Sequence, residues 1–195
     1  MNIGITGNIG SGKTTICRIF ETLEIPIYYA DDQAKKLMVD DLNVKEQVKL
    51  VFGLSTYDDD GELDKKYLGD IVFNNPKMLT KLNYIVHPAV ERHSLAWAKK
   101  QKGALYTIKE AALLIESGNY KSMDKIIVVT APLDLRIARV MARDKVEKSD
   151  VLLRNSKQMS EEEKVALADY VIINDGNHSL VKQVQKIHQQ LMTLV

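Results

Sequence analysis

The residues best suited to chemistry in this sequence stand close to its start. Residues 7–14 read Gly-Asn-Ile-Gly-Ser-Gly-Lys-Thr, which fits the phosphate-binding motif G-x-x-x-x-G-K-[ST]. Its glycines, including Gly10 and Gly12, allow backbone angles that other residues avoid, so several N–H groups can face one anion. In such a loop Lys13 reaches the β- and γ-phosphates, and the Thr14 hydroxyl binds Mg²⁺. The motif predicts a nucleoside triphosphate site.

The sequence around the motif has the pattern that the motif requires. Residues 2–6 alternate like a short strand, and apolar residues at 16, 19, 20 and 23 recur at helical spacing. A helix that begins beside the glycines adds partial positive charge where a phosphate would lie. The alternative, an ordinary glycine-rich turn before a lysine, does not require these flanks.

Composition narrows the class of protein. A chain of 195 residues with 45% hydrophobic and 27% charged residues suits one compact domain with inserted parts. A net charge of +1 argues against binding to nucleic acid or membranes by overall charge, and one cysteine excludes a disulfide framework. No signal peptide and no run long enough to span a membrane is recognised. We expect a cytoplasmic monomer.

A second short strand, over residues 24–29, has an acidic residue just after its carboxyl end. Asp31 follows that strand directly, and ligands of open α/β sheets gather at the carboxyl ends of strands. Asp31 is therefore a candidate for chemistry. Local sequence favours equally a helix cap, because aspartate satisfies unpaired N–H groups at a helix start.

The stretch from residue 32 to 102 is helical and longer than a strand-to-strand crossover requires. Helices are expected over residues 44–51, 68–73 and 78–97, with a turn at residues 57–61. His87-Pro88 interrupts the longest helix and predicts a kink or a break there. The stretch is a candidate substrate-binding subdomain.

Three later segments complete a parallel sheet. Residues 105–108, 125–130 and 169–173 are apolar and β-branched, and the run at 125–130 suits a strand covered on both faces. A final helix carries an apolar stripe that faces the core: Leu180, Val184, Ile187, Leu191 and Leu194. His188 beside the stripe is expected to be structural.

An arginine-rich helix and a charged segment follow the strand at 125–130. Arg136, Arg139 and Arg143 share one helix face. A solvated cationic face is one interpretation, and we favour phosphate contacts because the guanidinium fork suits phosphate. Residues 145–165 are highly charged, with Ser160 and Glu163 at capping-box spacing. They predict two short, weakly anchored helices that form a mobile lid.

These parts fit phosphoryl transfer, which depends on positioning and charge neutralisation. We predict an α/β fold: a parallel-sheet P-loop kinase core, a helical substrate-binding insertion and a small helical lid. The core comprises residues 1–31, 103–144 and 166–195, the insertion residues 32–102, and the lid residues 145–165. Asp31 would take the proton of an acceptor hydroxyl.

The chain resembles bacterial dephospho-CoA kinases, which phosphorylate the ribose 3′-hydroxyl of dephospho-CoA with ATP in the last step of CoA synthesis. The matches run from end to end: residues 5–15, Ala30-Asp31, Leu82-Asn83 with His87-Pro88, residues 113–116, Arg143-Asp144, Gln158, and Ala168-Asp169 through Asn174 and Gly176. Asp31, His87-Pro88, Leu-Leu-x-Glu and Asn-x-Gly in this order are more specific than the glycine loop alone.

The resemblance implies roles for individual residues. Catalysis would fall to Asp31 as base, Lys13, and Arg143 at the transferring phosphate. ATP would contact Gly10, Ser11, Gly12, Lys13, Thr14 and Thr15, with Asn174 and Gly176 beside the adenine and Mg²⁺ at Thr14. Dephospho-CoA would contact Asp31, His87, Leu113, Leu114 and Glu116, and Arg139, Arg154 and Gln158 would belong to the lid.

Two positions depart from the family pattern. Tyr29 stands where the family has an aspartate two residues before Asp31, so a second carboxylate is missing there. Ala112 stands where a proline precedes the leucine pair. The first departure bears on a metal site that needs two carboxylates, and the second on local rigidity only.

Two other functions stay open from the residues themselves. One is a P-loop kinase for nucleotides or a sugar acid, which the long helical insertion and His87-Pro88 disfavour. The other is a nucleotide-dependent switch without an acceptor, which lacks support because no GTPase base-recognition signature is present. Activity measured with a panel of acceptors tests the first alternative, and the rate of nucleotide turnover tests the second.

Overall fold

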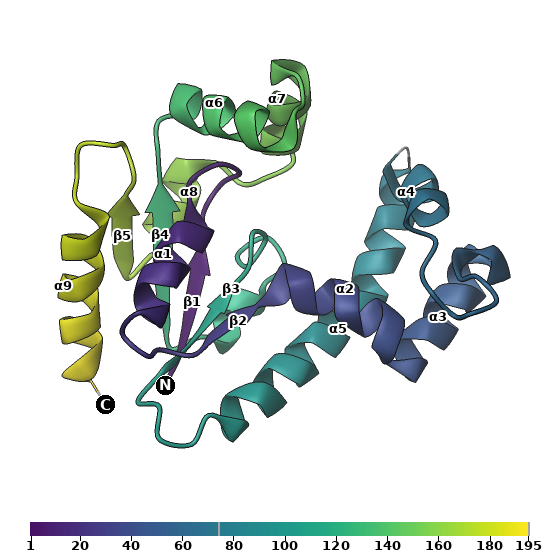
Figure 1. Cartoon of the computed structure of the whole chain (residues 1–195), viewed down its shortest axis with the longest axis horizontal. Helices are drawn as coiled ribbons and strands as arrows, with labels where there is room; N and C mark the ends of the chain where they lie inside the picture. Colours follow the sequence, from purple (N-terminus) through teal and green to yellow (C-terminus); the bar gives the residue numbers. More distant parts are fainter. Residues whose placement is uncertain (74, 195) are drawn as a thin grey trace. The chain divides into compact units, whose positions relative to one another are not determined.

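A five-stranded, all-parallel sheet is the centre of the chain's first structural unit (Figure 1). The computed structural model describes residues 1–73 and 75–194. The strands are β1 (Asn2–Thr6), β2 (Ile27–Tyr29), β3 (Thr107–Glu110), β4 (Lys125–Thr130) and β5 (Tyr170–Ile173). Their order is β2-β3-β1-β4-β5, so β1 lies between β3 and β4. The predicted parallel α/β sheet is confirmed, with β2 beginning later than predicted and β3 shifted by two residues.

The chain divides into two compact units, Met1–Tyr29 with Ala98–Val195, and Ala30–Trp97. We call the first the sheet unit and the second the helical unit. The α-helices are α1 (Lys13–Glu21), α2 (Ala30–Asp40), α3 (Leu42–Phe52), α4 (Lys65–Phe73), α5 (Pro76–Lys100), α6 (Leu133–Asp144), α7 (Lys148–Ser156), α8 (Glu161–Ala166) and α9 (Leu180–Met192). Short 3-10 turns lie at Leu54–Thr56 and Asn119–Ser122.

Both faces of the sheet are covered, as the apolar strands predict. On one face, buried residues of β1, β3, β4 and β5 pack with α1 and α9. On the other, Ile126 and Val128 of β4 pack with Leu114 and Ile115. The carboxyl end of β1 is therefore fixed from both sides before the glycine loop begins.

The C-terminal helix confirms most of the predicted apolar stripe. Val184, Ile187 and Leu191 are buried, whereas Leu194 is 56% exposed and lies past the end of α9, so its assignment to the stripe was wrong. The hydroxyl of Tyr106 and Nδ1 of His188 lie 2.6 Å apart. This contact confirms the structural role predicted for His188. Cys17 of α1 is fully buried in the same core.

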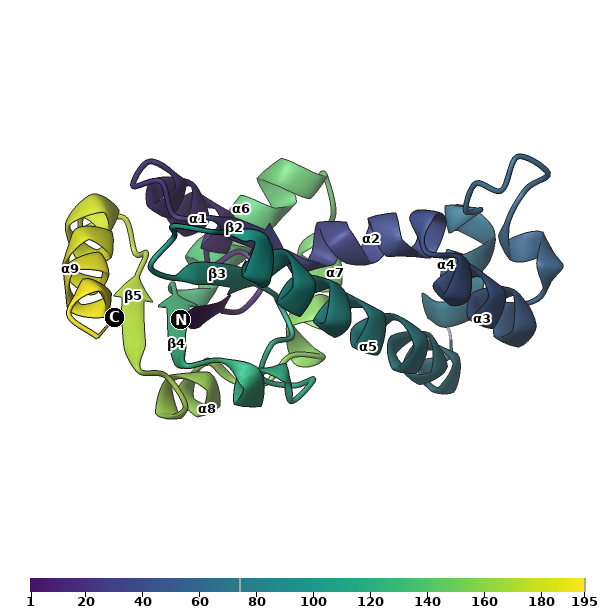
Figure 2. The same ribbon diagram turned by 90° about the horizontal axis from the view of Figure 1, so that it is seen from below.

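The helical unit contains the predicted helices and one difference. α5 runs through Pro88 as a single helix of 25 residues (Figure 2). Of the kink or break predicted at His87-Pro88, the break was therefore wrong. Buried residues lie on both sides of the proline, at Val86, Ala89 and Val90. Their common packing holds the helix together although proline removes one backbone hydrogen bond.

The segment of residues 145–165 forms two short helices, as predicted, but it is better anchored than its composition suggests. Val151 of α7 is 1% exposed and Lys164 of α8 is fully buried. Ser160 and Glu163 form the predicted capping box at the start of α8. The prediction of weak anchoring was wrong, and the mobility of a lid stays a prediction.

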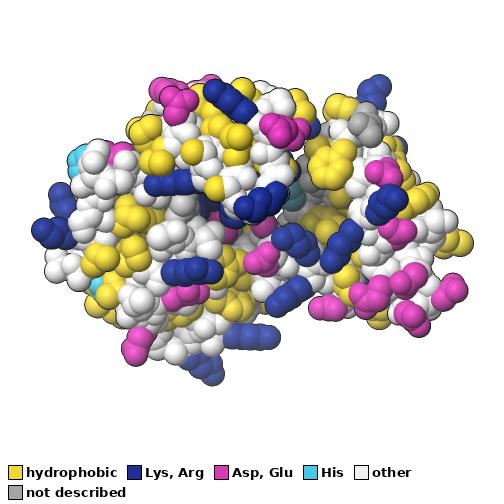
Figure 3. Space-filling view, turned by 45° about the horizontal axis from the view of Figure 1, so that its top comes forward, with side chains coloured by type: hydrophobic (Ala, Val, Ile, Leu, Met, Phe, Trp, Pro, Cys, Tyr) yellow, Lys and Arg dark blue, Asp and Glu magenta, His cyan; other side chains and the backbone are white. Residues whose placement is uncertain are grey.

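The surface carries charges of both signs. Figure 3 shows Lys and Arg side chains interspersed with Asp and Glu and with hydrophobic groups on the face in view. This mixture agrees with the net charge of +1. Among the helices that the structure describes, none is both long and apolar enough to cross a bilayer.

Candidate functional site

The glycine loop connects β1 to α1 in a conformation that only its glycines permit. Gly10 and Gly12 have positive φ angles of 80° and 94°. A Cβ on Gly10 would lie 2.5 Å from the carbonyl oxygen of Arg136, and one on Gly12 would collide with the side-chain amide of Asn174. The loop is thus pressed against neighbouring elements at two points, and larger residues would push it away.

The loop ends at the N-terminus of α1, whose first N–H groups no side chain caps. Gly12 is the N-cap of α1 and provides no side chain to satisfy them. Nζ of Lys13 donates to the carbonyl oxygen of Gly7 at 2.9 Å, so it bends back over the loop. Thr14 and Thr15 are exposed on the first turn. A helix N-terminus without a side-chain cap, the helix dipole and a nearby lysine together form a candidate anion site.

Asn174 ties the end of β5 to this loop. Its backbone N–H donates to Thr130 at 2.8 Å, and its side-chain Nδ2 donates to the carbonyl oxygen of Ser11 at 2.8 Å. Its Oδ1 accepts a 3.1 Å hydrogen bond from Nη2 of Arg139. The structure therefore brings together Asn174 and Arg139, which the sequence had placed at the adenine and in the lid. Gly176 follows two residues later with φ 89°.

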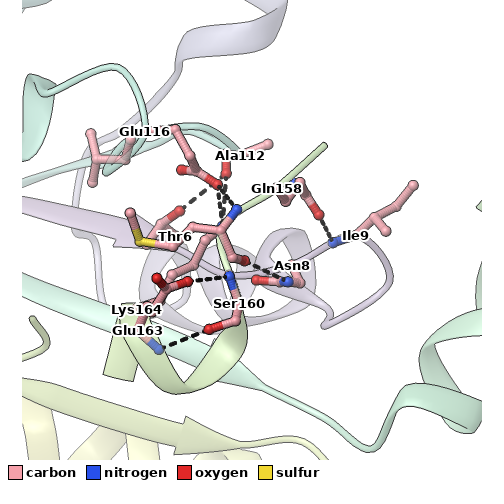
Figure 4. Close-up of polar contacts among 12 residues, drawn as sticks. Thr6, Asn8, Ile9, Ala112, Glu116, Gln158, Ser160, Glu163 and Lys164 are labelled. Atoms are coloured by element: carbon pink, nitrogen blue, oxygen red, sulfur yellow. Dashed lines mark hydrogen bonds and ion pairs between the residues drawn. The ribbon is translucent and has the colours of Figure 1, made fainter. Parts of the chain in front are cut away.

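A second brace comes from the linker between α7 and α8 (Figure 4). The N–H of Ile9 donates to Oε1 of Gln158 at 2.8 Å, and Nδ2 of Asn8 donates to the carbonyl oxygen of Met159 at 3.1 Å. Gln158, a predicted lid residue, therefore contacts the loop directly. Sequence reasoning missed Asn8, which is 2% exposed. The signal available in the sequence was a polar residue inside the binding motif.

The arginines of α6 have different surroundings. Arg136 is 6% exposed, and its guanidinium donates to Ala131 at 2.9 Å and to Asn155 at 2.7 Å. The phosphate contact favoured for Arg136 is therefore not supported, because protein oxygens and burial occupy this side chain. Arg139 is half-buried, and its Nη1 has no hydrogen-bond partner among the described residues.

Arg143 lies at the exposed end of α6 beside Arg154 of α7. Both donate to the carboxylate of Asp144: Arg143 at 2.6 and 3.1 Å, and Arg154 at 3.1 Å. The hydrogen bond from Arg143 lowers the pKa of Asp144 below its ordinary value. Asp144 thus holds two cationic side chains together at the surface, an arrangement suited to an anionic ligand.

Tyr29, at the end of β2, stands where the family pattern has an aspartate. A carboxylate, that of Glu110, lies on the neighbouring strand β3. The Tyr29 hydroxyl donates to Glu21 at 3.0 Å, and partial burial raises the pKa of Tyr29 above its ordinary value. Glu110 of β3 is paired in register with both Tyr29 and Ile5, and it is 7% exposed. Sequence reasoning missed this carboxylate, although an acid at the end of an apolar strand was visible.

The donor set fits a magnesium ion that is held mainly by its nucleotide. Within residues 1–73 and 75–194, no three His, Cys, Asp or Glu side chains gather as a protein-only metal site would require. Mg²⁺ commonly binds one or two carboxylates together with phosphates and water. The exposed hydroxyl of Thr14 and a carboxylate on the strand next to β1 are compatible with that arrangement.

The remaining predicted acceptor residues fall in both units. Asp31 lies in the first turn of α2, exposed to solvent, and it is inside the helix rather than at its N-cap. His87 is half-buried on α5. In the sheet unit, Leu113 is 39% exposed and Leu114 is fully buried in the core. Only the backbone of Leu114 is thus available to a ligand.

Comparisons with known proteins identify the family of the chain. The family model "Dephospho-CoA kinase" matches residues 1–179. A dephospho-CoA kinase of Aquifex aeolicus is 40% identical over 190 residues, which cover 97% of this chain and 96% of the relative. One of Bacteroides fragilis is 35% identical over 196 residues, with coverage of 96% and 95%.

Solved structures give the same result. The dephospho-CoA kinase of Campylobacter jejuni superposes with a TM-score of 0.70 at 29% identity, covering 97% of this chain and 96% of that one. The protein TT1252 of Thermus thermophilus gives 0.85 at 33% identity, with the same coverage. A shikimate kinase of Acinetobacter baumannii, at 0.56 and 18% identity, shares the fold.

Proposed function

Because this chain belongs to the dephospho-CoA kinase family, we propose that it transfers the γ-phosphate of ATP to the ribose 3′-hydroxyl of dephospho-CoA. The products are CoA and ADP, and the reaction is the last step of CoA biosynthesis. The observation that carries the proposal is the glycine loop braced at the start of α1, with Lys13 folded over it. That loop is a donor site for a triphosphate.

On the donor side, the roles follow from the positions of the side chains. Residues 10–15, together with the side chain of Lys13, would bind the β- and γ-phosphates. Asn174 and Gly176 follow β5 at the rim of the loop and would border the adenine. Arg143 is exposed at the end of α6 and would neutralise charge on the transferring phosphate. Arg139, Arg154 and Gln158 would belong to the lid.

On the acceptor side, Asp31 would act as the base. Its carboxylate accepts the proton of the 3′-hydroxyl while that oxygen forms a bond to the γ-phosphorus. The bond from the γ-phosphorus to the bridging oxygen breaks, and ADP leaves with the electron pair. Solvent then takes the proton from Asp31, which is exposed on α2.

The helical unit and the edge of the sheet unit would bind the rest of dephospho-CoA. His87 on α5, the exposed side chain of Leu113, the backbone at Leu114 and Glu116 are the candidates. We also propose that the enzyme acts as a cytoplasmic monomer, because its substrates are soluble nucleotides. Size-exclusion chromatography with light scattering tests the monomer.

A magnesium ion would be held by Thr14 and by phosphate oxygens, and Glu110 on the neighbouring strand β3 is a further candidate ligand. When bound, the ion neutralises charge on the β- and γ-phosphates. The protein's own residues would have three further roles. The loop fixes the donor, Asp31 takes the proton, and the lid would exclude water.

The direct test combines purified protein, ATP, Mg²⁺ and dephospho-CoA. We expect CoA and ADP in equal amounts, measured by liquid chromatography with mass detection. A nucleoside and a hydroxy acid serve as alternative acceptors, and a reaction without acceptor measures hydrolysis of ATP. Protein that binds ATP but forms no CoA contradicts the proposal.

A further inference from the structure

A buried ion pair lies beside the phosphate-binding loop. Nζ of Lys164 is 2.9 Å from Oε1 of Glu116, and the lysine side chain is fully buried while that of Glu116 is 19% exposed. Lys164 also lies 3.5 Å from the carbonyl oxygen of Ala112. Burial of an ammonium group is costly unless a counter-ion compensates it. Lys164 therefore depends on Glu116.

The same carboxylate oxygen also holds the linker between α7 and α8. Oε1 of Glu116 accepts a 3.0 Å hydrogen bond from the backbone N–H of Met159. The other oxygen, Oε2, is buried and has no hydrogen-bond partner among the described residues. The contacts with Lys164 and Met159 thus converge on one oxygen of the carboxylate, where α8 and the linker meet.

The linker in turn holds the loop. Gln158 accepts from the N–H of Ile9, and the carbonyl oxygen of Met159 accepts from Asn8, as described above. A continuous chain of contacts runs from Lys164 through Glu116 and the linker to the loop (Figure 4). Each member belongs to the sheet unit.

We propose that Glu116, paired with Lys164, is a positioning residue for the phosphate-binding loop and thereby sets the affinity for ATP. The inference rests on the proposed function in one respect, that a nucleoside triphosphate is the loop's ligand. It assigns Glu116 to the donor side, whereas the family resemblance implied contact with the acceptor. The ion pair keeps residues 158–159 in place, and these residues hold Asn8 and Ile9.

The test separates donor from acceptor binding. A non-hydrolysable ATP analogue with Mg²⁺, and dephospho-CoA alone, are titrated separately into the full chain by calorimetry. We expect Glu116→Gln to weaken analogue binding about tenfold, which corresponds to roughly 1.4 kcal/mol, and to leave dephospho-CoA binding unchanged. Glu162→Gln, at an exposed position on α8, the helix that carries Lys164, is the matched control and should bind both as the wild type does.

A double variant distinguishes positioning from charge burial alone. Glu116→Gln leaves Lys164 as a buried cation without its counter-ion, whereas Glu116→Gln with Lys164→Met removes both charges. We expect the double variant to recover thermal stability but not analogue affinity, because the neutral amide oxygen of glutamine accepts the Met159 N–H more weakly than the carboxylate does. Recovery of both overturns the positioning role.

Three outcomes of the titrations overturn the inference. They are unchanged analogue affinity in Glu116→Gln, a larger loss of dephospho-CoA binding than of analogue binding, and a wild type that does not bind the analogue. If Glu116→Gln does not fold, Gln158→Leu decides, because it removes only the acceptor of the Ile9 N–H. Weaker analogue binding then supports the inference, and unchanged binding overturns it.

Different results would contradict the proposed reaction and the positioning role of Glu116. A wild type that binds the analogue but forms no CoA contradicts the proposed reaction and leaves the role of Glu116 intact. A wild type that forms CoA, with an analogue affinity insensitive to Glu116→Gln, contradicts this inference alone.

Discussion

The side-chain Nδ2 of Asn174 donates to the carbonyl oxygen of Ser11, and the same side chain accepts from Arg139. One amide therefore links the end of β5, the phosphate-binding loop and α6. Since Asn174 is 8% exposed, water does not readily replace these contacts.

Removal of this amide should weaken both ATP binding and the fold. Asn174→Ala leaves the carbonyl oxygen of Ser11 and a nitrogen of Arg139 without partners. We expect the free energy of unfolding to fall by about 1–3 kcal/mol, because buried polar groups lose hydrogen bonds. ATP affinity should fall as well. Denaturant unfolding and calorimetry measure the two effects, and Asn177→Ala, at an exposed position in the following loop, is the control. ATP affinity equal to that of the wild type would show that the loop does not need this brace.

Substitution of Asp31 should lower kcat, whereas substitution of its neighbour Asp32 should not. Asp31→Asn should lower kcat by roughly 10²–10⁴, the usual contribution of a general base, while the KM for ATP stays near its wild-type value. Asp32→Asn is the matched control, because Asp32 forms an exposed ion pair with Lys35 at 3.1 Å. Such pairs contribute at most about 1 kcal/mol. Steady-state kinetics decide, and equal effects of the two substitutions would mean that Asp31 is only a helix residue.

Arg143 should act on the transition state rather than on stability. Arg143→Gln removes an exposed cation that Asp144 orients, so we expect little change in melting temperature. kcat should fall by about 10²–10³, as when one group that stabilises transition-state charge is lost. Arg18→Gln, exposed on α1, should leave kcat unaltered. Should Arg143→Gln raise only the KM for ATP, the arginine binds the ground state instead.

The loop after β5 has a measurable response to pH. Hydrogen bonds from the backbone N–H groups of Asn177 and His178 lower the pKa of Asp175 to about 2, below its ordinary value of 3.8. A carboxyl whose pKa is depressed by folding stabilises the protein above the unfolded value and loses that effect as pH falls. Asp175→Asn should thus be less stable than the wild type at pH 7, and the difference should vanish between about pH 4 and pH 2. Carboxyl NMR titration checks the pKa directly, and a midpoint near 3.8 would contradict the expected value.

Local patterns in the sequence predicted the elements well and their long-range partners poorly. The periodicity of apolar residues identified β4, α6 and α9 because each buries one face or both. The pattern around Pro88 predicted a kink or a break, but α5 continues through the proline, with Val86 and Ala89 buried on either side of it. Local rules describe a proline correctly only when tertiary contacts do not oppose it.

The parts of the site that involve distant residues were not predictable. The glycine loop was recognised from its own motif, whereas the contact of Ser11 with Asn174 joins residues 163 positions apart. Lys164 looks like a surface residue in a charged helix, and its burial depends on Glu116, which precedes it by 48 positions (164 − 116). Spacing within one element carries no information on such pairs.

The protein has one cysteine, Cys17 of α1, and its side chain is fully buried in the core. Burial raises the pKa of its thiol, so the reactive thiolate is suppressed. Thiol-directed dyes or spin labels attached to cysteines introduced on the surface will therefore report from those sites alone, without prior removal of the native residue. Inter-label distances recorded with and without substrates would then test the predicted mobility of residues 145–165.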